Sequence, residues 1–284
     1  MDLRITSYNC RGLKTSINDV QDLCSVSDIV FLQETWLLPH EITMLSHLHP
    51  DFDCNGSSAV TIDQGVIEGR PHGGLAVLWR KILTPYITLD KDQSEPRLLG
   101  MHLRTSEDTS PLFFINTYMP FQCDAHYDMF LEVLGKIAAR IEDAGSTLIA
   151  LVGDFNASRG SLFDTELVQW CRTYSLVLSD VAQLAEDTHT YVSAAHGTTS
   201  WLDHIITSKD LHRSVHSTLV HDLLPGSDHL AVSCSLALPT LTRPPLTRVE
   251  RPDVPQHSGC RWSAADIAAY MIHGRHAAEF SAPT

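Results

Sequence analysis

The chain has 284 residues, a formal net charge of −14 at pH 7, 43% apolar residues and 19% charged residues. This composition indicates a soluble globular protein with enough apolar side chains for one large domain or two small ones. No apolar run approaches the ~18 residues that a membrane span needs, and residues 1–5 lead directly into a strand pattern. We therefore expect no membrane span and no signal peptide.

The seven cysteines are scattered along the chain and form no CxxC pair. We expect reduced thiols rather than a disulfide framework, as in a nuclear or cytoplasmic protein that is not secreted. The charge of −14 argues against binding of nucleic acid over a broad basic surface, because phosphate neutralisation needs clustered Lys and Arg. This objection is partial, since carboxylates gathered around a divalent cation add negative charge without repelling the substrate once metal is bound.

The first part of the chain alternates between strand and helix patterns. Apolar periodicity predicts a strand at 3–9, a helix at 16–25, a strand at 28–33 and a short helix at 41–47. Four strand-like segments separated by turn-rich breaks follow, at 73–80, 82–89, 97–104 and 112–118. Because no helix pattern interrupts these four segments, we expect them to form one antiparallel layer.

The second part of the chain repeats this alternation without a sequence repeat. A long amphipathic helix is predicted over residues 124–143, where apolar residues recur at helical spacing. It precedes a strand at 148–152, a helix at 162–174 and strands at 201–207, 215–221 and 229–236. Frequent prolines from residue 239 predict a domain of residues 1–238, a Pro-rich linker at 239–261 and a short C-terminal segment at 262–284, helical or disordered.

Polar side chains stand at the ends of several predicted strands. The apolar strand at 148–152 runs through Gly153 into Asp154 and Asn156, which point the same way and present adjacent polar tips at one sheet edge. Similar clusters lie at 7–9, 32–35, 115–118, 201–204 and 226–229. Each alone is typical of a turn or cap, but together they indicate a functional site at a sheet edge.

The carboxylate of Glu34 points to a metal. Glu34 follows a strand predicted to be buried on both faces, where a carboxylate is costly unless a cation or donors meet it. Oxygen ligands suit Mg²⁺ or Mn²⁺, and the lack of a thiolate or paired-His motif argues against zinc. The only suggestive zinc spacing is His257, Cys260, His273 and His276 in the tail, which a chain of this length carries by accident.

Seven short motifs occur in order along the chain: SYNCRGL (7–13), FLQETWL (31–37), GGLAVLW (73–79), INTYMP (115–120), LVGDFNAS (151–158), SWLDHI (200–205) and GSDHLAV (226–232). They resemble the ordered motifs of the endonuclease/exonuclease/phosphatase superfamily, and the set is far more specific than any one member. The resemblance implies a deoxyribonuclease-like α/β fold, a four-layered α/β-sandwich of two packed mixed β-sheets flanked by helices. Within the superfamily the chain looks most like the apurinic-endonuclease-like endonuclease domain of non-LTR retrotransposons.

The resemblance also implies roles for individual residues. Glu34 would be the principal metal ligand, with Asn9 beside it and Asp228 near the metal. Asp154 would position or deprotonate the attacking water, while Asn156 would orient Asp154 and touch the phosphate. These parts agree with the physics of phosphodiester cleavage, which needs a positioned nucleophile, a base and stabilisation of charge on oxygen.

Further roles follow from the remaining motifs. Asp203 would hold His229 in the tautomer that donates to a phosphate oxygen, and Tyr118 would add a hydroxyl to the same oxygen. Substrate contacts are expected at Asn116, Arg11, Ser200, Thr190, Tyr191 and His196. The segment 190–199 would form a hairpin at the DNA minor groove, or an ordinary surface loop.

Two positions depart from the resemblance. Arg11 stands where apurinic-site enzymes usually carry an acidic residue, and Phe121 stands where many relatives have Asn near the phosphate. These departures argue against abasic-site repair. Arg11 would contact a backbone phosphate instead, or remain a solvated surface arginine.

The resemblance implies a Mg²⁺-dependent endonuclease that nicks one strand of double-stranded DNA and leaves a 3′-hydroxyl for target-primed reverse transcription. We expect a monomer, with a reverse transcriptase domain downstream in a longer polyprotein. A phosphatase or phosphodiesterase of inositol lipids or sphingomyelin is an alternative, which the charge favours and the lack of a membrane-binding apolar segment disfavours. An inactive retrotransposon remnant, at most a binding module, is a third reading, against which the intact motif residues argue.

Overall fold

The computed structural model describes residues 2–60, 62–63, 66–67, 69–90, 95–105, 110–222 and 224–238. These residues all belong to one unit, residues 1–244. The linker and terminal segment predicted beyond residue 238, with the tail histidines and Cys260, lie outside the described residues and stay predictions. Within the described part, no helix is both long and apolar enough to cross a membrane.

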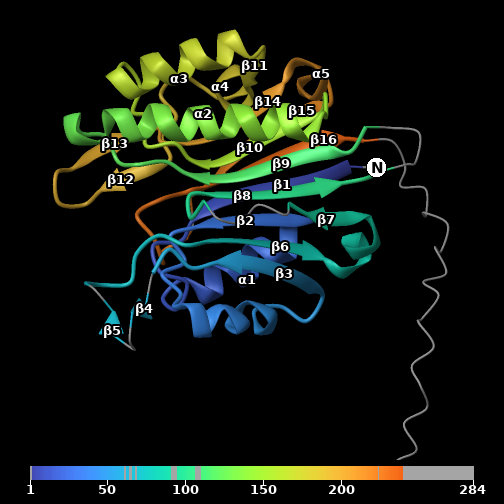
Figure 1. Cartoon of the computed structure of the whole chain (residues 1–284), viewed down its shortest axis with the longest axis vertical. Helices are drawn as coiled ribbons and strands as arrows, with labels where there is room; N and C mark the ends of the chain where they lie inside the picture. The colour runs from blue at the N-terminus through green and yellow to red at the C-terminus, as the bar shows by residue number, and fades with distance from the viewer. Residues whose placement is uncertain are drawn as a thin grey trace, which may run out of the picture. The chain divides into compact units, whose positions relative to one another are not determined.

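Two six-stranded sheets form the centre of the fold (Figure 1). The first sheet runs in the order β15 (Val215–His221), β16 (Ala231–Ala237), β1 (Asp2–Asn9), β2 (Ile29–Gln33), β6 (Leu75–Arg80) and β3 (Phe52–Ser57). The second runs in the order β11 (Leu176–Leu178), β14 (Asp203–Ser208), β10 (Ile149–Asp154), β9 (Leu112–Tyr118), β8 (Leu98–Leu103) and β7 (Ile87–Leu89). Each sheet is mixed, because the pairs β1–β2 and β9–β10 are parallel and the other pairs are antiparallel.

Helices cover the outer faces of both sheets. Helix α1 (Ile17–Val26) and the 3₁₀ helix η1 (Pro39–His47) pack on the first sheet, and α2 (Tyr127–Ala144) and α3 (Leu162–Thr173) pack on the second. The short helices α4 (Ser179–Gln183) and α5 (Lys209–His212) contact β14. The smaller elements are η2 (Lys81–Tyr86), η3 (Asp124–His126) and two hairpins, β4 (Ile62–Asp63) with β5 (Val66–Ile67) and β12 (Tyr191–Ser193) with β13 (Thr198–Ser200).

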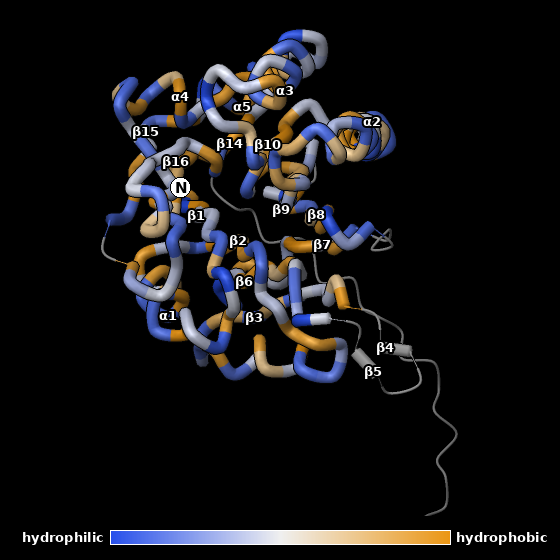
Figure 2. Tube along the Cα trace, turned by 90° about the vertical axis from the view of Figure 1, so that its left-hand side faces the viewer, coloured by the Kyte–Doolittle hydropathy of each residue, from blue (hydrophilic) through white to orange (hydrophobic). Residues whose placement is uncertain are grey.

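Apolar packing joins these layers, and Figure 2 shows apolar segments running along many of the strands. One cluster lies between the two sheets, where the rings of Phe31 and Phe114 are 5.5 Å apart. A second lies between β9–β10 and the helices α2 and α3, where the rings of Phe130 and Phe163 are 4.2 Å apart. A third lies under α1 and η1. These contacts confirm the predicted four-layered α/β-sandwich, because each apolar interface separates two layers.

Some local predictions were wrong. Residues 73–80 do not join an antiparallel layer with the next three segments, because β6 pairs with β2 and β3 of the first sheet. Most of 82–89 is the 3₁₀ helix η2, which contains Pro85, a residue that cannot donate to a strand ladder. Strand β3 was missed because its sequence FDCNGS has only two apolar residues and ends in Asn-Gly-Ser, which is typical of a turn. The helix expected at 41–47 is a 3₁₀ helix that begins at Pro39.

A buried polar clamp joins the two sheets behind the edge where the polar strand ends meet. The amide of Asn116 on β9 donates to the carbonyl oxygens of Leu32, at 3.0 Å, and Ala76, at 2.9 Å, on the first sheet. Its oxygen accepts from Gln33 Nε2 at 2.7 Å. Asn116 is fully buried and its side-chain amide is used in the clamp, and the substrate contact expected of it stays a prediction.

Replacing Asn116 with Ala should lower the free energy of unfolding by about 2–5 kcal/mol, because each buried group left without a partner costs about 1–3 kcal/mol. Urea unfolding followed by circular dichroism measures the change. The matched control is Asn18→Ala, at an exposed position of α1, where we expect a change below about 0.5 kcal/mol. Equal stability of the two variants would contradict the clamp.

Candidate active site

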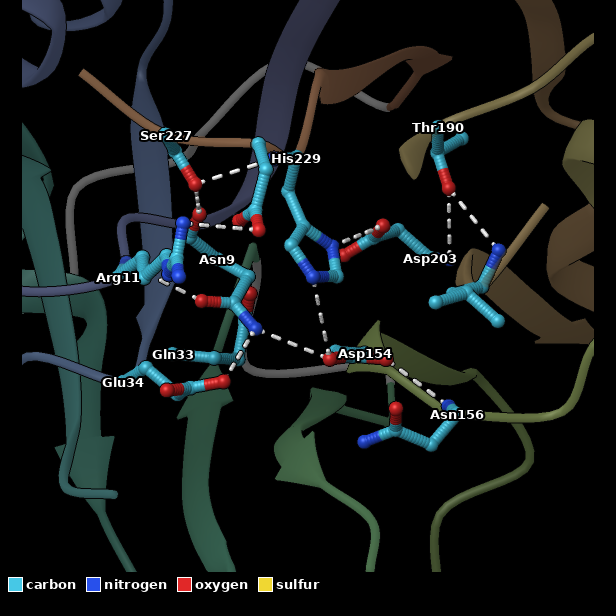
Figure 3. Close-up of polar contacts among 12 residues, drawn as sticks. Asn9, Arg11, Gln33, Glu34, Asp154, Asn156, Thr190, Asp203, Ser227 and His229 are labelled. Atoms are coloured by element: carbon cyan, nitrogen blue, oxygen red, sulfur yellow. Dashed lines mark hydrogen bonds and ion pairs between the residues drawn. The ribbon is translucent and has the colours of Figure 1, made fainter. Parts of the chain in front are cut away.

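Polar residues from both sheets meet at one edge of the sandwich (Figure 3). In each sheet the parallel pair ends there: Asn9 ends β1 and Glu34 follows β2, while Tyr118 ends β9 and Asp154 ends β10. The antiparallel strand β14 begins at the same edge, so Asp154 is paired with Tyr118 on one side and Asp203 on the other. The predicted convergence of strand ends therefore occurs, with the residues drawn from two facing sheets.

The backbone at this edge adopts unusual conformations. Arg11, Glu34 and Asn156 have positive φ angles of 43°, 54° and 50°. Left-handed backbone at non-glycine residues costs of order 1 kcal/mol or more and gathers at functional sites. Gly153 has φ 149°, and a Cβ there would lie 1.9 Å from the carbonyl oxygen of Thr117. Only glycine therefore lets β10 approach β9 closely enough to place Asp154.

Asn9 links carboxylates of the two sheets. Its Nδ2 donates to Glu34 Oε1 at 3.0 Å and to Asp154 Oδ2 at 2.9 Å (Figure 3). Its Oδ1 accepts from the backbone N–H of Arg11 at 3.2 Å. The second oxygen of Glu34 accepts from Trp36 Nε1 at 2.9 Å. Glu34 and Asp154 are thus held close together by donors that offset their mutual repulsion.

His229 stands between two carboxylates. Its Nδ1 lies 2.8 Å from Asp203 Oδ2, and its Nε2 lies 3.9 Å from Asp154 Oδ2. Burial lowers the pKa of His229, but the negative charges of Asp203 and Asp154 outweigh burial and raise the pKa to about 10. The ring is therefore a cation near neutral pH. Its gap to Asp154 is longer than a hydrogen bond, which leaves a place for a bridging water or ligand oxygen.

Asp154 is oriented on both of its oxygens. Oδ1 accepts from the backbone N–H of Asn156 at 2.9 Å, and Oδ2 accepts from Asn9. Asn156 uses its side-chain amide to bond the carbonyl oxygen of Met119 at 2.9 Å. Burial raises the pKa of Asp154 to about 7, with His229 lowering it and Asp203 raising it. A fixed carboxylate with a pKa close to neutral is suited to accept a proton.

Tyr118 and Asp228 complete the edge. Burial and then the charges of Glu34 and Asp154 raise the pKa of the half-buried Tyr118, so its hydroxyl stays protonated and acts as a donor. Asp228 Oδ2 forms an ion pair with Arg11 Nη1 at 3.0 Å. The structure therefore gives Arg11 a carboxylate partner at the site.

The residues present fit a hard divalent cation. Asp228 Oδ1 and Asp203 Oδ1 are buried and have no hydrogen-bond partner within the described part of the chain. Buried carboxylate oxygens are costly unless a donor or cation meets them. Atoms of Asp154, Asp203 and His229 also lie within 4.8 Å of one another, although His229 and Asp203 already bond each other. The carboxylates of Glu34, Asp154 and Asp228 are oxygen donors, which suit Mg²⁺ or Mn²⁺ better than zinc.

The residues of segment 190–200 that were expected to contact substrate differ in burial and in their contacts. Thr190 is fully buried, and its hydroxyl accepts from the backbone N–H groups of Leu202 and Asp203, both at 3.0 Å. These bonds position Asp203, and the substrate contact expected of Thr190 stays a prediction. The ring of Tyr191 lies 4.9 Å from that of His229. Ser200 and His196, half-buried and exposed respectively, belong to the same hairpin.

Sequence reasoning missed Asp180, which lies behind β14. This fully buried carboxylate accepts from Trp201 Nε1 at 2.9 Å, from His204 Nδ1 at 2.7 Å and from the backbone N–H of Ile205 at 3.2 Å. It therefore anchors the strand that begins with Asp203. No local pattern marks Asp180, although Trp201 and His204 each needed a buried partner.

The sequence model of the endonuclease/exonuclease/phosphatase family matches residues 6–229. The chain belongs to this family. No curated protein sequence matches the chain. Family membership, together with structural neighbours that are nucleases and phosphatases, supports a hydrolase.

Solved structures share the fold. The 3′ phosphatase NExo from Neisseria, bound to a product DNA hairpin, has a TM-score of 0.65 at 18% identity and covers 83% of this chain and 100% of its own. An AP endonuclease from Archaeoglobus fulgidus has a TM-score of 0.65 at 15% identity, with the same coverage. The endonuclease domain of TRAS1, a telomere-specific non-LTR retrotransposon, has a TM-score of 0.61 at 14% identity and covers 84% of this chain and 99% of its own. At these identities the similarity establishes the fold alone.

Replacing Asp180 with Asn should destabilise the fold more at pH 6 than at pH 9. Burial lowers the pKa of His204, but Asp180 outweighs burial and the pKa is raised. The stabilisation from the charged pair is therefore complete below the unfolded pKa of about 6.5 and is lost as pH rises through the higher folded pKa. At pH 6 the loss should approach the ~3–5 kcal/mol typical of breaking a buried ion pair.

Urea unfolding at the two pH values measures this difference. Asp22→Asn, at an exposed position of α1, is the matched control and should have a small effect at both pH values. A loss from Asp180→Asn that is equal at both pH values, or larger at pH 9, would contradict the assignment.

Proposed function

We propose that this protein is a Mg²⁺-dependent endonuclease that nicks one strand of double-stranded DNA and leaves a 3′-hydroxyl. One observation carries the proposal: a buried imidazolium and an oriented carboxylate, His229 and Asp154, face each other at 3.9 Å, and Asn9 links the same Asp154 oxygen to Glu34. Hydrolysis of a phosphodiester requires this combination, a base for water next to a cationic donor for phosphate.

Asp154 handles the water in this proposal. Its two oxygens are fixed by Asn156 and Asn9, so the carboxylate has one orientation toward the gap in front of His229. Asp154 accepts a proton from the water whose oxygen attacks phosphorus, the bond from phosphorus to the 3′ oxygen breaks, and the leaving oxygen takes a proton from solvent to become the 3′-hydroxyl. Asn156 belongs to the same turn as Asp154, which places it next to the phosphate in this proposal.

His229 and Tyr118 bind the phosphate. His229 donates its Nε2 proton to a non-bridging oxygen, while Asp203 fixes the tautomer by accepting from Nδ1. The protonated hydroxyl of Tyr118 donates to the same oxygen. Donors already fixed at the place where negative charge develops need no rearrangement during the reaction, which is why they lower its barrier.

Glu34, with Asn9 and Asp228, supplies oxygen ligands for Mg²⁺, and Mn²⁺ fits the same donors. When bound, the ion neutralises charge on the phosphate and on the leaving 3′ oxygen. Arg11 pairs with Asp228 at this edge and is placed to contact a neighbouring backbone phosphate.

The neighbourhood of His229 supports DNA as the substrate. An isolated antiparallel β-bridge pairs Tyr191 with His229, so the hairpin β12–β13 lies beside the site. His196 is exposed near the turn of this hairpin. Such a hairpin reaches a DNA groove without needing many base contacts. The NExo structure bound to a product DNA hairpin shows that this fold accommodates DNA in a relative.

The similarity to the TRAS1 endonuclease domain supports a place in target-primed reverse transcription. The nick would supply the primer end for a reverse transcriptase domain downstream in a longer polyprotein, and the nuclease itself would act as a monomer. The 3′-hydroxyl is the product that such a polymerase requires.

Supercoiled plasmid incubated with the protein and Mg²⁺ should become nicked circles that a DNA polymerase extends. Asp154→Ala should slow nicking by about 10²- to 10⁴-fold, because the general base is lost. EDTA should abolish nicking, and added Mg²⁺ or Mn²⁺ should restore it. Gel analysis of plasmid forms over time measures the rates.

The matched control is Asp22→Ala, which removes an exposed carboxylate on α1 and should nick at the wild-type rate. Equal nicking by Asp154→Ala, or nicking that persists in EDTA, would overturn the proposal. Release of phosphate from inositol phosphates without plasmid nicking would support the phosphatase alternative instead.

A further inference from the structure

A cavity of about 470 Å³ lies beside the loop that follows Glu34, with Thr35 and Trp36 in its lining. Trp36 lines this cavity and also donates to Glu34 Oε2 at 2.9 Å, so the cavity shares a wall with the ligands proposed for the metal. Its other walls include Gly12, Thr35 and Arg70. We call it the Trp36 pocket. Its volume falls in the range of pockets that hold small ligands.

The Trp36 pocket is rigidly built. Trp36 has φ 54°, and its backbone N–H donates to the carbonyl oxygen of Gly73 at 2.9 Å. Gly12 donates to the carbonyl oxygen of Glu34 at 2.8 Å, which ties the loop after β1 to the loop after β2. A Cβ on Gly12 would lie 2.7 Å from Trp36 Cε3, so this position is open only to glycine. The indole is therefore fixed before any ligand arrives.

The chemistry of the pocket differs from that of the whole chain. The chain carries 34 acidic and 20 basic residues, yet the described residues that line this cavity include Lys14 and Arg70 and no carboxylate. Lys14 pairs with Glu41 at 2.5 Å and keeps a side chain 55% exposed, so part of its donor capacity faces solvent. The described rim therefore carries two cations, one of them paired with a carboxylate, beside the proposed site of phosphodiester cleavage.

Two features of the lining suit a nucleotide. The indole of Trp36 is half-buried, and Lys14 and Arg70 carry positive charges at the rim. A half-buried indole beside rim cations can hold a single base and its phosphates. The hydroxyl of Thr35 is itself buried and is not offered to a ligand.

We infer that the Trp36 pocket binds an unpaired nucleobase of the substrate, stacked on Trp36, with the phosphates beside it contacting Lys14 and Arg70. The inference rests on the proposed nuclease function, since it assigns the pocket to the same nucleic acid. It makes DNA with an unpaired base near the cleaved phosphate a better ligand than continuous duplex. Stacking supplies the preference, because every base has a π-face and the fixed indole loses little freedom on binding.

The test measures binding in EDTA, so that it does not depend on cleavage. The probes are a duplex with one bulged 2-aminopurine and the same duplex with the 2-aminopurine paired. Wild-type protein should bind the bulged duplex more tightly and quench its fluorescence as the base stacks on the indole. Trp36→Leu should remove the quenching and weaken binding of the bulged duplex by about 5- to 150-fold, with little effect on the paired duplex.

Matched variants separate stacking from folding. Trp36→Phe keeps an aromatic face and should retain most of the preference. Trp170→Leu removes a half-buried indole on α3 and should leave both affinities unchanged. The quenching of the bulged probe by wild-type protein tests the inference even if Trp36→Leu fails to fold.

Several results would overturn the inference. These are equal binding of the two duplexes by wild-type protein, quenching that survives Trp36→Leu, or loss of affinity for both duplexes alike. Binding to vesicles containing phosphatidylinositol bisphosphate that is lost in Trp36→Leu would assign the pocket to a lipid headgroup and also overturn it. If plasmid nicking fails while the bulge preference depends on Trp36, the proposed activity fails and base binding by the pocket stands.

Discussion

The amide of Asn9 donates to two carboxylates that belong to different sheets, and the arrangement of the site depends on this pair of hydrogen bonds. Glu34 and Asp154 lie on either side of one nitrogen, so like charges approach closely without direct contact. The sandwich makes this possible, because the parallel pair of each sheet ends at the same edge and the sheets face each other across an apolar core. Without that registration, Asn9 would reach one carboxylate only, and one oxygen of the other would lose its donor.

The fold maintains strained backbone at this edge through its packed interior. Arg11, Glu34, Trp36 and Asn156 have positive φ angles, and they lie in the loops that follow strands β1, β2 and β10. The clamp of Asn116 and Gln33 binds the sheets just behind these loops. Such unfavourable conformations persist where the surrounding structure determines them, and they fix side chains before a ligand binds.

Much of this arrangement was predictable from the sequence, and the misses have physical causes. Buried strands that end in polar residues predicted a shared edge, and the ordered motifs predicted the sandwich. A polar residue near a strand end gives no sign of whether it faces the site or the core, however. The sequence therefore did not predict that Asn116 joins the sheets or that Thr190 holds the start of β14. Asp180 was not predicted because its partners, Trp201 and His204, are more than twenty residues away in the sequence.

If the two sheets together build one metal-assisted site around Glu34, a crystal of the protein soaked in Mn²⁺ should hold an ion there. Anomalous scattering should place an ion within about 2.5 Å of a Glu34 oxygen, with Asn9 or Asp228 also coordinating. The peak should disappear in Glu34→Gln. An ion bound between Asp203 and His229 instead, or no ion at Glu34 in the wild-type crystal, would contradict the account.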